Sequence, residues 1–123
     1  MKITRLDHVQ LAMPPGGEEA AREFYGRILN LRELEKPAQL QANGGCWFAG
    51  DGIELHLGIQ ADFVPARKAH PGLRVADLDT ARSHLQAEGV PITADKSGVK
   101  MRRFYIHDPF GNRLEIMQEG DSF

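Results

Sequence analysis

The sequence has little cysteine, no excess of positive charge and no long apolar run. Its single cysteine, Cys46, excludes an intramolecular disulfide and a cysteine-rich zinc site. The net charge of −2 lacks the positive balance expected of a nucleic-acid-binding protein. No apolar stretch approaches the length of a membrane span, and the first residues show no signal-peptide pattern. We therefore expect a cytoplasmic protein without a nucleic-acid or membrane partner.

Common motifs for nucleotide binding and nucleophilic catalysis are missing as well. The chain contains no glycine-rich phosphate loop, no dinucleotide-binding fingerprint and no serine nucleophile motif. Its 123 residues are 41% hydrophobic and 26% charged, an ordinary mixture for a globular protein and enough chain for one domain.

Hydrophobic periodicity and turn residues predict the same order of elements twice. In the first half they predict a strand over 3–13, a helix over 18–31, and strands over 31–36, 39–43, 45–49 and 52–59, with hairpin turns at Asn43-Gly44 and Asp51-Gly52. In the second half they predict a strand over 70–75, a helix over 78–88 between Asp77 as N-cap and Gly89, and strands over 90–94, 102–107 and 113–118. The fold class is therefore α+β, a single domain over 1–123 with two βαβββ modules at about 3–60 and 70–118. Residues 61–69 form a linker between them.

A histidine and a glutamate recur at matching places in the two modules. His8 and His70 each lie early in the first strand, and Glu54 and Glu115 each lie in the middle of the last. Glu54 follows His8 by 46 positions, and Glu115 follows His70 by 45. A spacing that differs by one residue, together with the repeated element order, indicates an internal duplication.

Strand alternation places both glutamates opposite aliphatic neighbours. If the aliphatic faces pack on helices, the carboxylates point into whatever the other face encloses, where they need a partner, a proton or a metal ion. A solvent-facing strand is the simpler alternative for either glutamate alone. Pseudo-twofold symmetry would instead bring both His–Glu pairs to one axis. Two imidazoles and two carboxylates suit a divalent ion such as Zn, Ni, Co, Mn or Fe, with open positions for substrate.

His56 adds an alternative ligand. It lies two residues after Glu54, on the same strand face, and could replace or join it. The repeat favours Glu54, because the position that matches His56 in the second module is Met117.

The chain resembles the vicinal oxygen chelate superfamily, also called the glyoxalase/bleomycin resistance/dioxygenase superfamily. The resemblance covers nearly the whole chain, and its most specific part is the run Asp108-Pro109-Phe110-Gly111-Asn112 with Glu115 three residues later. The other segments that carry the resemblance are Leu6-Asp7-His8-Val9, Phe24-Tyr25, Ile53-Glu54-Leu55 and the run from His70 to Asp79. It implies paired βαβββ modules in a partly open mixed β-barrel, the glyoxalase-like fold, around a metal site and usually in a homodimer.

Residue by residue, the resemblance implies a metal held by His8, Glu54, His70 and Glu115. It also makes Glu54 and Glu115 candidate catalytic bases. One departure is Pro71, which replaces the usual aliphatic residue after His70 and predicts an edge or distorted strand there.

Three further residues are candidates for substrate binding: Arg74, Trp47 and Arg103. Arg74 is predicted on the same face as His70, where a solvated arginine is an equal alternative. Trp47 could line a pocket or pack in the core. Cys46 is expected to be a small buried residue rather than a nucleophile.

These observations predict a metal-dependent lyase or isomerase whose small substrate chelates the ion through neighbouring oxygens. The alternatives are a ring-cleaving dioxygenase or a thiol transferase of the same superfamily, or a dimer that sequesters a drug without catalysis. A thiol cosubstrate is compatible with the resemblance. Half-barrel edges also favour a homodimer.

Overall fold

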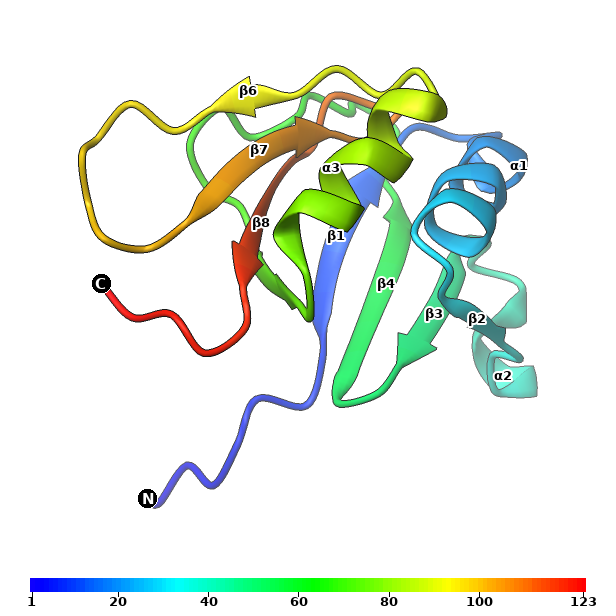
Figure 1. The fold of residues 1–123 in the computed structure, drawn as a ribbon. Coiled ribbons are helices and arrows are strands. Elements are labelled where there is room, and N and C mark those ends of the chain that lie inside the picture. The colour runs from blue at the N-terminus through cyan, green and yellow to red at the C-terminus, as the bar shows by residue number, and fades with distance from the viewer. The chain divides into compact units, whose positions relative to one another are not determined.

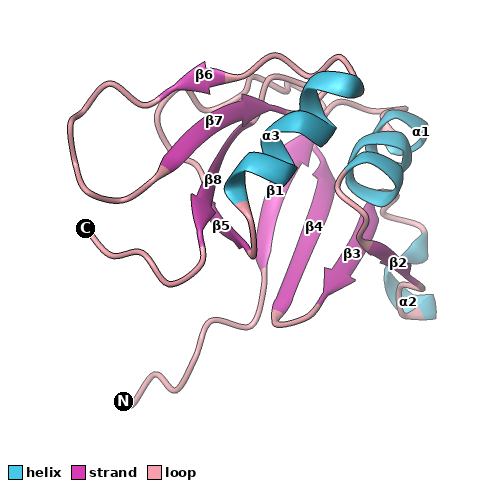
Figure 2. Cartoon of the chain, in the orientation of Figure 1, coloured by secondary structure: helices cyan, strands magenta, loops and turns pink.

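The structure is a computed structural model that describes all residues from Met1 to Phe123. It divides into two compact units, Met1–Val64 and Pro65–Phe123. Each unit contains one four-stranded mixed sheet in which the first strand lies parallel to the last (Figures 1 and 2). This repeated topology confirms the predicted α+β fold of two βαβββ modules.

The first unit has the sheet order β1-β4-β3-β2. Figure 1 shows its main helical segment lying along one face of this sheet. Its elements are β1 (Val9–Met13), α1 (Glu18–Ala21), η1 (Arg22–Ile28), β2 (Arg32–Leu34), α2 (Ala38–Gln41), β3 (Cys46–Gly50) and β4 (Ile53–Ile59).

Four predictions for the first unit need correction. The strand predicted from residue 3 begins only at Val9, because the preceding segment extends away from the sheet without a partner strand (Figure 1). The helix predicted over 18–31 is a short α-helix followed by a π-helix, since Leu29 N–H donates to the carbonyl of Phe24 five residues back at 2.8 Å.

The strand predicted over 39–43 is wrong, and so is the hairpin at Asn43-Gly44. Those residues form α2 and the turn after it. Leu40 N–H donates to the Pro37 carbonyl at 2.8 Å, and Asn43 N–H donates to the Leu40 carbonyl at 3.1 Å. Local turn hydrogen bonds therefore replace strand pairing in this stretch.

The second unit repeats the pattern with the order β5-β8-β7-β6. The strands predicted over 70–75 and 90–94 are shorter than expected, and Pro71 precedes an edge strand as predicted. Its elements are β5 (Gly72–Val75), α3 (Leu78–Ala87), β6 (Thr93–Ala94), β7 (Arg103–His107) and β8 (Arg113–Gln118).

Residues at its two ends determine where α3 begins and ends. The Asp77 carboxylate accepts a hydrogen bond from Thr80 N–H at 2.9 Å, so it caps the helix as predicted. This hydrogen bond also lowers the pKa of Asp77. Gly89 ends the helix with a φ of +74°, which an L side chain adopts only under strain.

Each sheet has an apolar face that forms the core of its unit. In β4, Leu55 and Leu57 are buried beside the aromatic residues Tyr25 and Phe48. Burying one such leucine contributes about 1.5–3 kcal/mol. Alternation therefore leaves Glu54 and His56 on the opposite face. No helix combines the length and apolar character of a membrane span.

Candidate functional site

The first unit brings two histidines and a glutamate together. His8, Glu54 and His56 present ligand atoms that all lie within 4.8 Å of one another. Glu54 and His56 are two residues apart on β4, and His8 immediately precedes β1, the parallel neighbour of β4. The arrangement follows from the pairing of the first and last strands of the module, since Val9 is in register with Leu55.

His56 is the most constrained member of this cluster. Its ring stacks between those of Trp47, with centroids 4.0 Å apart, and His8, at 4.2 Å. Its Nε2 lies 2.7 Å from Oε2 of Glu54. The His56 side chain is 5% exposed, whereas that of Glu54 is 33% exposed. Packing and hydrogen bonding therefore fix the imidazole orientation before any ligand arrives.

His8 is oriented by its neighbour in the chain. Its Nδ1 lies 2.8 Å from a carboxylate oxygen of Asp7, and this hydrogen bond lowers the pKa of Asp7. A carboxylate accepts the Nδ1 proton and leaves Nε2 with its lone pair, which is the usual arrangement in metal-binding histidines.

The chemistry of the cluster fits a divalent transition metal. Imidazole nitrogen and carboxylate oxygen are ligands for Zn, Fe, Co, Ni and Mn. Two ligands about 2.1 Å from one ion lie at most about 4.2 Å apart, so these three side chains need to approach one another only slightly. The residues present are therefore suited to hold such an ion.

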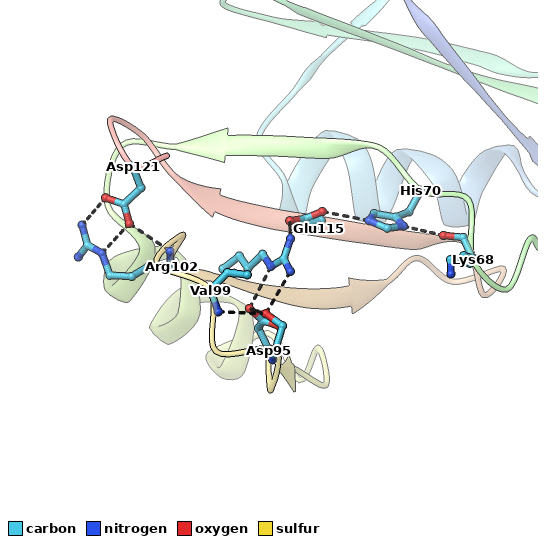
Figure 3. A network of polar contacts seen from close by, with 9 residues as sticks. Lys68, His70, Asp95, Val99, Arg102, Glu115 and Asp121 are labelled. Atoms are coloured by element: carbon cyan, nitrogen blue, oxygen red, sulfur yellow. Dashed lines mark hydrogen bonds and ion pairs between the residues drawn. The ribbon is translucent and has the colours of Figure 1, made fainter. Parts of the chain in front are cut away.

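The second unit contains a matching His–Glu pair in a longer polar network (Figure 3). His70 Nδ1 donates to the backbone carbonyl of Lys68 at 2.7 Å, and its Nε2 faces Oε2 of Glu115 at 3.0 Å. Because a carbonyl only accepts, Nδ1 is the donor in the first contact, and Nε2 lies within hydrogen-bond distance of Glu115. The carbonyl contact is again typical of metal-binding histidines.

Arg103 holds the far side of Glu115. Its Nη1 donates to Oε1 of Glu115 at 2.8 Å, and its Nε donates to Asp95 at 3.0 Å. The pKa of Arg103 rises because of these hydrogen bonds. Both oxygens of Glu115 are thus engaged, and the Glu115 side chain is only 9% exposed.

A buried turn positions the strand that contains Glu115. The Asp108 carboxylate accepts hydrogen bonds from Phe110 N–H at 2.9 Å and Asn112 N–H at 2.8 Å. Gly111 in the same turn has a φ of +91°. The Asp-Pro-x-Gly-Asn run therefore organises the β7–β8 connection.

The predicted substrate-binding residues lie in different surroundings. Trp47 lines a cavity in the first unit, and Arg103 contacts Glu115. The Arg74 guanidinium donates to the carbonyls of Gln118 and Asp121. His84 and His107, the two remaining histidines, are exposed.

Cys46 is buried in the first unit, as predicted. Burial raises the pKa of its thiol to about 11. A thiol with so high a pKa is protonated near neutral pH and is a poor nucleophile.

Of the residues around the cavity in the first unit, the sequence singled out only Trp47 as one that could line a pocket. The cavity has a volume of about 390 Å³ and includes Gln10, Lys36 and Asn43 among its lining residues. No sequence signal distinguished Lys36 or Gln10. Gln10 reaches the wall through the pairing of β1 with β4, and Lys36 contacts the Gly44 carbonyl at the end of the turn after α2. Asp7 could have been found, since it directly precedes the predicted ligand His8.

Comparison with known proteins agrees with this fold. The family model of the Glyoxalase/Bleomycin resistance protein/Dioxygenase superfamily matches residues 5–116. The chain belongs to this superfamily. No curated protein matches it in sequence.

Solved structures of the superfamily fold are similar along most of the chain. A glyoxalase family protein from Bacillus anthracis is 42% identical with a TM-score of 0.92, covering 96% of this chain and 97% of that one. A variant of the fosfomycin resistance protein FosX from Listeria monocytogenes, in complex with Mn(II) and a dihydroxypropylphosphonic acid, is 18% identical with a TM-score of 0.78. It covers 95% and 93% of the two chains. The antibiotic-binding protein TnmS3 from a Streptomyces species is 24% identical with a TM-score of 0.71, covering 94% and 98%.

Proposed function

We propose that this superfamily member is a metal-dependent lyase or isomerase that acts on a small substrate with two neighbouring oxygen atoms. The main support is the His8–Glu54–His56 cluster, where a nearly buried imidazole is held beside a carboxylate and a second imidazole. A divalent ion bound by these residues would supply Lewis-acid polarisation of a substrate carbonyl.

Glu54 is our candidate for the group that moves the proton. The structure shows it accepting through Oε2 only, from His56, and its side chain is 33% exposed. Glu115, the other predicted base, has its two oxygens engaged by His70 and Arg103. A carboxylate with an accessible oxygen is better placed to take a proton next to a carbonyl. Trp47 and His8 hold His56 in place beside it.

Metal analysis of the purified full-length protein tests the proposal. We expect about one ion per chain in the native protein and at least about a tenfold weaker affinity in H8Q, E54Q and H56Q. H84Q is the matched control, because His84 is exposed on α3. Equal, near-zero metal in all five proteins after loading with Zn, Ni, Co, Mn or Fe(II) would contradict a metal enzyme and favour a sequestering protein.

Activity assays on the loaded protein address the reaction. Hemithioacetals test the glyoxalase reaction and a thiol cosubstrate at once. We expect E54Q to lose turnover by about 10²-fold or more, as for removal of a general base. Turnover unchanged in E54Q would eliminate Glu54 as the base.

Ring-cleaving dioxygenation is a second candidate, favoured by one observation. The first-unit cluster contains two histidines and one carboxylate, the ligand set of non-haem Fe(II) oxygenases. Oxygen consumption by Fe(II)-loaded protein with a catechol, in the absence of hemithioacetal turnover, would select this reaction.

We further propose that the chain forms a homodimer. β2 and β1 are the edges of one sheet, and β5 and β6 are the edges of the other. Exposed edges are surfaces that a second chain can cover. Light scattering should give about twice the chain mass of 13.7 kDa. The mass of a single chain would overturn this proposal.

A further inference from the structure

The cavity in the first unit lies beside the candidate metal cluster. Gln10 and Trp47 both line it, and both are in register with His56, from opposite sides of β4. These two side chains therefore share a sheet face with His56, and Trp47 also stacks on it. A molecule in the cavity would lie against residues that surround the cluster.

The cavity walls combine an apolar surface with one positive charge. Besides Trp47, the cavity is lined by Leu40 and Ile59, which are 38% and 37% exposed. Lys36 is the only charged residue in the lining, which contains no acidic side chain. The full lining is Gln10, Lys36, Leu40, Asn43, Gly44, Trp47, Leu57, Gly58 and Ile59.

Two glycines keep this space open. A Cβ atom at Gly58 would lie 2.5 Å from Nε2 of Gln10, and one at Gly44 would lie 2.5 Å from Cδ1 of Ile59. Gly44 also has a φ of +69°, which disfavours any side chain. The absence of side chains at these positions therefore preserves a volume in the range of small-molecule sites, about 300–1,000 Å³.

Lys36 has donor capacity left for a ligand. Its ammonium group donates to the carbonyl of Gly44, and an ammonium has three N–H donors. No carboxylate forms an ion pair with Lys36, and Glu18, the acidic residue next to Gly44, contacts Gly45 N–H at 3.4 Å. A half-buried ammonium without an anionic partner favours binding of an anion.

We propose that this cavity binds a small organic acid, with an aromatic or alkyl body against Trp47 and Leu40 and an anionic group paired with Lys36. This proposal rests on the proposed function. It adds that the part of the substrate away from the metal is an apolar body with an anionic group. The acid is held by Lys36 and the apolar wall, so its binding does not require the ion.

Isothermal titration calorimetry with a matched pair of probes tests this inference. The probes are 4-phenylbutyrate and its neutral amide, which has the same shape. Emission of Trp47, the only tryptophan, serves as a second readout at the cavity wall. We expect native protein to bind the acid about tenfold more tightly than the amide, as for a charge-assisted hydrogen bond.

Variants assign the preference to Lys36. K36M should bind the two probes equally, K36R should retain the preference for the acid, and K96M, at an exposed lysine of the second unit, should behave as native. Equal binding of the probes by native protein, binding of neither, or a preference that persists in K36M would overturn the inference.

The metal proposal is separated from this one by repeating the titrations after EDTA treatment. The preference for the acid should persist without metal. Normal metal content with no preference for the acid overturns only the cavity inference. A Lys36-dependent preference in a protein that binds no metal overturns only the proposed function.

Discussion

His56 is held on both faces and at one edge, more firmly than either of the other residues of its cluster. Trp47 and His8 cover the two faces of the imidazole, and Glu54 contacts its Nε2. Such surroundings fix the direction of the ring nitrogens without using a metal ion. The properties of the cluster should therefore depend on residues that are not ligands.

Trp47 provides the first prediction. We expect W47A to bind metal about tenfold more weakly than native protein, because the imidazole loses one stacking partner and gains rotational freedom. W47F retains an aromatic face and should lose less. Competition with a chromophoric chelator measures the affinities. An affinity of W47A equal to that of native protein would show that the stack does not position His56.

Asp121 gives a prediction at low pH. Hydrogen bonds from Arg102 lower the pKa of Asp121 from its ordinary value of 3.8 to about 2. A lowered folded-state pKa adds stability that is fully present above the unfolded-state value and is lost as the pH falls toward 2. The stability difference between native protein and D121N should thus be largest above about pH 5 and shrink toward about pH 2.

Urea unfolding midpoints across that range measure this difference. D62N is the control, because Asp62 is exposed and forms no ion pair, so its difference from native protein should vary less with pH. A D121N difference that stays constant from about pH 6 to about pH 2 would rule out the Arg102–Asp121 pair as the source.

At the scale of elements, close strand pairing leaves no room for a side chain at the start of β3. Gly45 has a φ of +85°, and a Cβ atom there would lie 2.3 Å from the carbonyl oxygen of Leu57. Backbone atoms cannot move aside as a flexible side chain can, so the strands would have to separate. This position therefore requires glycine for both conformation and space.

We expect G45A to lower the free energy of unfolding by about 2–3 kcal/mol or more, measured by chemical denaturation. G16A is the matched control, because Gly16 has a similar φ of +82° but nothing within 4 Å of the added atom. It should cost only about 1–2 kcal/mol, from the left-handed conformation alone. Equal losses in the two variants would show that β3 and β4 accommodate the methyl group.

The elements that could be predicted from sequence are those with local signals. The Asp77 cap and Gly89 define α3, and Asp51-Gly52 joins β3 to β4. Residues 39–43 were mispredicted because a short apolar-polar alternation fits a strand and a helical turn equally well. The π-helix after α1 was likewise invisible, since its hydrogen bonds depend on how the segment packs.

The candidate site also combines residues that the sequence predicted with contacts that it could not predict. The positions of His8, Glu54, His70 and Glu115 were predicted from the repeat and the family resemblance, and their roles as ligands remain proposals. The stack of Trp47 on His56 could not be predicted, because it requires the register between β3 and β4. Contacts between distant strands are set by the fold and leave no short motif in the chain.

At the scale of the whole molecule, the internal duplication gives both units a histidine beside a glutamate. We predict that E115Q lowers the metal content of the full-length protein, as H8Q does, because the repeat assigns a ligand role to both glutamates. Mass spectrometry of metal-loaded, desalted protein measures this. Metal content of E115Q equal to that of native protein would restrict binding to the first-unit cluster.

The pairing of the first strand with the last also determines when each unit can form during synthesis. β1 is synthesised early but hydrogen-bonds only to β4, which ends at Ile59. The backbone N–H and C=O groups of β1 therefore stay unpaired until most of the unit has been translated. Domains generally fold as units, with the N-terminal one first. The first unit is complete at Val64, before β5 begins at Gly72. Every hydrogen-bond partner in the first sheet, and each residue of the Trp47–His56–His8 stack, therefore precedes the second sheet in the order of synthesis.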